Sequence, residues 1–115
     1  MTTIVIGGGA SGMLSAYYAK LGGGEVILIE QNEKLGKKLY ITGKGRCNLT
    51  NYCQVDEFLL NEVSNPKFLM SSINGLTPQD TYELFEDLGL KLKVERGNRV
   101  FPLSDKSSDV IKTLN

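Results

Sequence analysis

Three glycines near the start of the chain have the spacing of a phosphate-binding turn. Gly7, Gly9 and Gly12 fit the pattern G-x-G-x-x-G directly after a short apolar run. The first glycine permits a tight turn, the second lets the backbone approach a pyrophosphate, and the third lets a helix lie close to a strand. The N–H groups and partial positive charge of a helix N-terminus attract phosphate oxygens. The pattern therefore predicts a dinucleotide site, with a purely structural turn as the alternative.

An acidic residue follows at the distance that such a site requires. Glu30 lies eighteen residues after Gly12, where its carboxylate can accept hydrogen bonds from ribose hydroxyls. A carboxylate at this position disfavours a 2′-phosphate, so we expect FAD or NAD rather than NADP. The contacts predicted for this part of the site are Gly7, Gly9, Ala10, Ser11, Gly12, Glu30 and Gln31.

A strand, a helix and a second strand must position these residues. The β-branched run Thr2–Ile6 predicts a buried parallel strand. Apolar residues then recur at helical spacing from Ala10 to Leu21, and the glycines at 22–24 end that helix. Val26–Ile29 predicts the second strand. The fold class is therefore α/β, with a Rossmann-like βαβ unit over residues 2–30.

The remaining sequence predicts a largely helical excursion over 55–89 and a hairpin over 90–103. Within the excursion we expect short helices at 55–63 and 67–73, then a helix from Pro78 to about Leu88 with Thr77 as N-cap and Gly89 as C-cap. In the hairpin, one strand covers 90–94 and the other 99–101. A last helix is expected over 108–115.

The composition limits the chemistry that these elements could carry. The chain has 115 residues, which suits one globular domain, and its 13 basic and 13 acidic side chains cancel, which disfavours nucleic-acid and membrane partners. Its apolar runs are too short for a signal peptide or a membrane span, so we expect a cytoplasmic protein. The absence of histidine excludes a Ser-His-Asp triad and most zinc sites within these residues. No catalytic or metal-binding residue is predicted, and redox chemistry would need an organic cofactor.

A second segment, over residues 36–51, is more specific than the glycine turn. It reads Gly-Lys-Lys-Leu-Tyr-Ile-Thr-Gly-Lys-Gly-Arg-Cys-Asn-Leu-Thr-Asn. With it the chain resembles the BaiN-like, also called YhiN-like, bacterial NAD(P)/FAD-dependent oxidoreductases, some of which are described as aminoacetone-oxidase-like FAD enzymes. The resemblance covers the whole chain, up to Arg99-Val100-Phe101-Pro102 and Ser104. Lys44 departs from the pattern, because most members have glycine there.

The resemblance implies a longer flavoprotein with two dinucleotide-binding domains. In it, this chain would be the N-terminal part of a discontinuous FAD-binding domain, and NAD(P)H or oxygen would complete the cycle. The segment 36–51 would lie along the pyrophosphate and ribityl chain of FAD, although a solvated loop is the alternative for its lysines. The contacts that the resemblance adds are Lys37, Lys38, Leu39, Thr42, Gly43, Gly45, Arg46, Cys47 and Asn48.

Two cysteines raise the question of a redox disulfide. Five residues separate Cys47 from Cys53, one more than in the redox pair of flavoprotein disulfide reductases, and the intervening residues lack that family's pattern. We therefore expect two free thiols, with Cys47 buried near the flavin.

The sequence predicts an FAD-dependent oxidoreductase that transfers hydride between a small-molecule substrate and flavin. A nucleotide-binding piece without activity of its own, an NAD-only dehydrogenase domain and a disulfide reductase are the alternatives. We expect the Thr2–Ile6 strand to have one unpaired edge and the apolar side of the last helix, Val110, Ile111 and Leu114, to lack part of its covering. The isolated chain should then associate with itself or with the rest of a longer chain.

Overall fold

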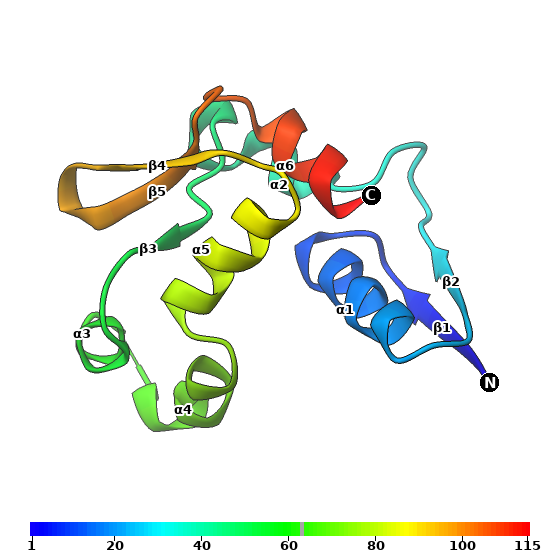
Figure 1. Cartoon of the computed structure of the whole chain (residues 1–115), viewed down its shortest axis with the longest axis horizontal. Coiled ribbons are helices and arrows are strands. Elements are labelled where there is room, and N and C mark those ends of the chain that lie inside the picture. The colour runs from blue at the N-terminus through cyan, green and yellow to red at the C-terminus, as the bar shows by residue number, and fades with distance from the viewer. Residues whose placement is uncertain (63) are drawn as a thin grey trace. The chain divides into compact units, whose positions relative to one another are not determined.

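The computed structural model describes residues 1–62 and 64–115 (Figure 1). These residues divide into two compact units, one formed by residues 1–47 with 106–115 and the other by residues 48–105. The predicted helix over 55–63 ends at Val63, which lies outside the described residues.

Two parallel strands and their connecting helix form the centre of the first unit. Strand β1 (Thr2–Ile6) pairs with β2 (Glu25–Ile29), and helix α1 (Ala10–Leu21) connects them and covers one face of the pair (Figure 1). Because alternate residues of a strand point to opposite faces, Val5 and Leu28 share the covered face. The predicted βαβ unit is confirmed, but the prediction that its first strand is buried is wrong, because no residue of β1 is buried.

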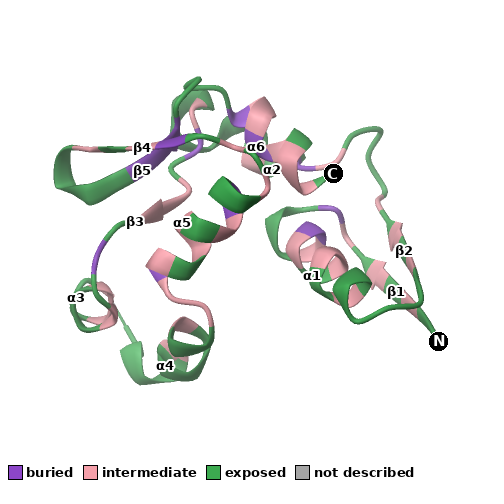
Figure 2. Ribbon diagram, viewed as in Figure 1, coloured by how far each residue is buried: buried purple, intermediate pink, exposed green. Residues whose placement is uncertain are grey.

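The other face of this strand pair is apolar and exposed. Ile4, Ile6, Ile27 and Ile29 are 59%, 84%, 41% and 50% exposed (Figure 2). The second edge of β1 has no partner strand among the described residues, as predicted. A parallel pair with one apolar face open is unusual, because parallel sheets are normally covered on both faces.

Two further helices belong to this unit, one that follows β2 in the chain and one formed by residues that come after the second unit. Helix α2 (Lys37–Ile41) continues into a 3₁₀ turn, η1 (Thr42–Gly45), and helix α6 (Ser107–Leu114) packs against α1 and α2. The Ser107 hydroxyl donates to the Tyr40 carbonyl oxygen at 2.6 Å. The apolar side of α6 was expected to lack part of its covering. Ile111 and Leu114 are half-buried, in agreement with this, but the expectation is wrong for Val110, which this packing buries completely.

The second unit contains a small antiparallel sheet in the order β3–β5–β4. The predicted hairpin is confirmed as β4 (Leu92–Glu95) and β5 (Arg99–Pro102), joined by the turn η2 (Arg96–Asn98). The first strand begins at Leu92 rather than Leu90, because the Leu90 N–H donates to the Phe85 carbonyl and so completes the end of a helix. Strand β3 (Thr50–Asn51) was not predicted.

Three helices complete the second unit, namely α3 (Val55–Leu60), α4 (Pro66–Gly75) and α5 (Pro78–Asp87). Thr77 caps α5 as predicted: its hydroxyl accepts from the Asp80 N–H at 3.1 Å, and the Asp80 carboxylate accepts from the Thr77 N–H at 3.0 Å. Gly89 follows the C-cap residue, Leu88, instead of being it. No helix within the described part of the chain is long and apolar enough to cross a membrane.

Candidate dinucleotide site

The glycine turn joins β1 closely to α1. Gly7 has a φ of +100°, and its N–H donates to the Ile29 carbonyl at 2.7 Å. A Cβ atom at Gly12 would collide with the Gly7 carbonyl oxygen. Two of the three glycine roles predicted from the pattern, the tight turn and the close approach of helix to strand, are therefore present in the backbone.

Open space lies beside the second glycine of the pattern. Gly9 is the N-cap residue of α1 in an ordinary extended conformation, with φ −80° and ψ −172°. A Cβ atom added there would have no heavy atom within 4 Å. Ala10 and Ser11 are exposed, and the first turn of the helix contains no acidic residue. Negative charge at this end of the helix is therefore favoured and sterically permitted.

Glu30 stands next to this turn with half of its carboxylate unsatisfied. Its Oε1 accepts from the Gly8 N–H at 3.5 Å, so Glu30 lies at the same edge of the sheet as the glycine turn. Its Oε2 is buried and has no hydrogen-bond partner among the described residues. A buried, unpaired carboxylate oxygen is costly, and a ribose hydroxyl would satisfy it. Gln31 follows on the surface.

The loop after β2 is fastened to the same turn. The Gly36 N–H donates to the Gly8 carbonyl at 2.7 Å, and the Leu35 side chain lies against Gly8. A Cβ atom at Gly36 would come within 2.8 Å of Ile111 on α6. These contacts bring the glycine turn, Glu30 and the start of the segment 36–51 into one region.

The predicted contacts in the segment 36–51 have different surroundings. Lys37 and Lys38 are exposed, whereas Leu39 is half-buried. The Thr42 hydroxyl donates to the Leu39 carbonyl at 2.6 Å. Arg46 is half-buried, and Asn48 is an exposed residue that begins the second unit. The contact of these residues with FAD stays a prediction.

Lys44 lies in the middle of a left-handed stretch of backbone. Gly43, Lys44 and Gly45 have φ values of +57°, +55° and +86°. The left-handed region is strained for a lysine but not for a glycine. The backbone at this position therefore favours glycine, and Lys44 adopts a conformation that is strained for its side chain.

Both cysteines are free thiols, and both are buried, although burial was predicted for Cys47 alone. Burial raises the pKa of Cys47 above its ordinary value of 9.0, and a hydrogen bond with Thr42 partly offsets this. The pKa of Cys53 is likewise raised by burial and by the negative charge of Glu57. Neither thiol is set up as a nucleophile, because reactive cysteines have a lowered pKa. The described residues contain no cluster of side chains that could hold a metal ion.

A family model described as the HI0933-like protein Rossmann domain matches residues 1–115. The chain belongs to this family. It is a family of flavin- or dinucleotide-binding oxidoreductases, which agrees with the glycine turn and with the resemblance found in the segment 36–51.

The chain is similar to curated proteins of two kinds. A 3-dehydro-bile acid delta(4,6)-reductase of Clostridium scindens is 38% identical over 112 residues, which are 96% of this chain and 27% of that protein. Ribosomal RNA dihydrouridine synthases of Escherichia coli and Haemophilus influenzae are 36% and 34% identical over 88 residues, each covering 76% of this chain and 21% of theirs. The chain thus spans about a quarter of the length of these relatives.

Sequence reasoning missed the part that Gly8, Leu35 and Gly36 play in fastening the loop. Gly8 occupies a variable position of the glycine pattern, so the pattern gives it no role. The sequence signal was Gly36, which follows the apolar Leu35 and precedes Lys37 and Lys38. Such a glycine is typical of a turn against a packed surface.

We expect Lys44→Gly to stabilise the protein by about 1 kcal/mol, because it removes left-handed strain at a non-glycine residue. Lys38→Gly is the matched control: Lys38 lies within α2, and glycine there should destabilise by a similar amount. Urea unfolding followed by circular dichroism measures both. If both substitutions changed the free energy of unfolding in the same direction, the left-handed conformation of Lys44 would be contradicted.

Both thiols should react slowly in the folded protein. We expect iodoacetamide alkylation at pH 8 to be slower than in urea, with an apparent pKa above 9.0 for each cysteine. Because the folded pKa is raised, the stabilisation from the neutral thiols is present below pH 9.0 and is lost as pH rises through the folded pKa. Mass spectrometry of the alkylated protein resolves the two sites. A thiol that alkylates equally fast when folded and unfolded would refute its burial.

Proposed function

We propose that this chain supplies the adenosine and pyrophosphate contacts of an FAD-dependent oxidoreductase. The observation that carries the proposal is the buried, unpartnered Oε2 of Glu30 beside the glycine turn. A ribose hydroxyl donating to that oxygen would remove the cost of burying it. The open N-terminus of α1 would then receive the pyrophosphate.

FAD is proposed over NAD because of the residues beyond the βαβ unit. An NAD-only dehydrogenase needs the glycine turn and the acidic residue but not the segment 36–51, which carries the flavoprotein resemblance. Gly36, the first residue of this segment, donates a backbone hydrogen bond to Gly8. The glycine turn and the segment 36–51 can therefore contact one extended ligand.

The names of the relatives favour reduction of a carbon–carbon double bond. One is named a delta(4,6)-reductase and two are named dihydrouridine synthases. A dihydro product has two more hydrogens than its parent, so both names describe reductions. Reduced flavin would supply the hydride. The names differ in substrate, since one states a bile acid and two state ribosomal RNA. For this protein we propose a small molecule with an electron-poor double bond, because a net charge of zero gives the chain no general attraction to RNA. The residues of this chain would bind and orient the cofactor.

Three substitutions separate cofactor binding from folding. Gly9→Ala should leave the far-ultraviolet circular dichroism unchanged, because an alanine fits the backbone and open space at this position, but it should abolish FAD binding by blocking the pyrophosphate. Gly12→Ala should disturb the fold itself through its collision with Gly7. Glu30→Ala should weaken FAD binding by about ten- to hundredfold.

Glu25→Ala is the matched control for Glu30, since it removes an exposed glutamate from the opposite end of β2. Flavin fluorescence titration gives the FAD affinity, and competition by ADP-ribose tests the adenosine half alone. Equal effects of the two glutamate substitutions would refute the ribose contact. Binding of NADH in preference to FAD would favour the dehydrogenase alternative.

A further inference from the structure

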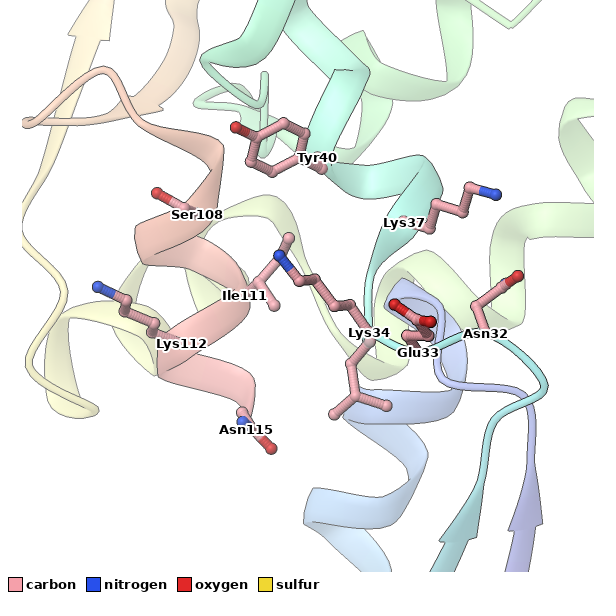
Figure 3. A pocket seen from close by; sticks show the side chains of 10 residues that line it. Asn32, Glu33, Lys34, Lys37, Tyr40, Ser108, Ile111, Lys112 and Asn115 are labelled. Carbon is pink, nitrogen blue, oxygen red and sulfur yellow. The ribbon is translucent and has the colours of Figure 1, made fainter.

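A cavity of about 890 Å³ lies between the loop that follows β2 and helix α6 (Figure 3). All its lining residues belong to the first unit. Of the residues predicted to contact the cofactor, it includes Lys37 alone, and neither Glu30 nor the glycine turn lines it. It is therefore a second candidate binding site beside the dinucleotide site.

Positive charge is concentrated around this cavity although the whole chain is neutral. Lys34, Lys37 and Lys112 line it, against the single carboxylate of Glu33. Among the lining side chains, three ammonium groups and one carboxylate leave two positive charges in excess. None of the three lysines has an ion-pair partner among the described residues. Lys34 extends across the cavity toward Ile111, and the ends of Lys37 and Lys112 lie toward opposite rims (Figure 3).

The inner surface of the cavity is apolar and is held by packing. Leu35 lies against Gly8, and Ile111 lies against Gly36, so both half-buried side chains have fixed neighbours. The exposed Tyr40 ring comes from α2. The backbone carbonyl of Tyr40 accepts a hydrogen bond from Ser107 of α6, which ties the two helices together. An aromatic or aliphatic ring of a ligand could lie against these side chains while its charged group reaches the lysines.

We infer that this cavity binds an aromatic phosphomonoester. The dianion of such a group is attracted by the positive lining, and Lys34, whose side chain extends across the cavity, would be its point-charge ligand. The cavity volume falls within the range of small-molecule sites. A carboxylate carries half the charge and a neutral alcohol none, so both should bind more weakly.

The test uses 2-naphthyl phosphate, which is fluorescent. It lacks the ribose hydroxyls from which Glu30 would accept hydrogen bonds. Fluorescence anisotropy at pH 7.5 and low salt should show saturable binding, weakened about tenfold by Lys34→Gln and further by adding Lys112→Gln. Lys91→Gln removes an exposed lysine of the second unit and should have no effect. Circular dichroism checks that each variant keeps its fold.

The comparison ligands and Gly9→Ala make the outcome decisive. 2-Naphthoate and 2-naphthol should bind more weakly than 2-naphthyl phosphate. Gly9→Ala, which should block the pyrophosphate position of the dinucleotide site, should leave the affinity for 2-naphthyl phosphate unchanged even where FAD binding is lost. Absence of binding, equal binding of the three probes, or full affinity in the double lysine variant would overturn the inference. Loss of 2-naphthyl phosphate binding in Gly9→Ala would assign the probe to the dinucleotide site and would also overturn the inference.

Discussion

The missing Cβ at Gly12 lets α1 start directly against the turn that leaves β1, and the rest of the candidate site depends on this close approach. The parallel register places Ile6 opposite Ile29, so both strands end at the same edge of the sheet. Glu30, the next residue after β2, therefore reaches the turn. A side chain at Gly12 would push the helix N-terminus away from the Glu30 carboxylate, which we propose holds a ribose.

The backbone of Gly8 also connects the glycine turn to the loop that follows β2, and this connection sets the path of that loop. Its N–H meets Glu30 and its carbonyl accepts from Gly36, so one residue between β1 and α1 holds both the acid and the loop. A Cβ atom there would meet Leu35 and the side chains at the end of β2. Packing, and not only phosphate approach, therefore explains the run of three glycines.

Periodic segments were predictable from the sequence, whereas features set by distant contacts were not. The βαβ unit and α5 follow from residue pattern and from the Thr77 cap. Strand β3 has two residues, too few for any alternation, and forms because β5 offers it an edge. Burial of Val110 depends on α6 returning to α1 and α2, far from it in sequence. The left-handed backbone conformation of Lys44 was likewise not predictable, because lysine has no preference for it.

The sequence of the two parallel strands is apolar on both faces, which is the pattern of a sheet that is covered twice. Only one of these faces is covered by α1, and isoleucines form the other. Exposed apolar area and an unpaired Glu30 oxygen raise the free energy of the same small sheet. A ligand that binds the folded form alone adds stability in proportion to its affinity. Cofactor binding and covering of the isoleucine face should therefore reinforce one another, because each stabilises the strand ends that position Glu30.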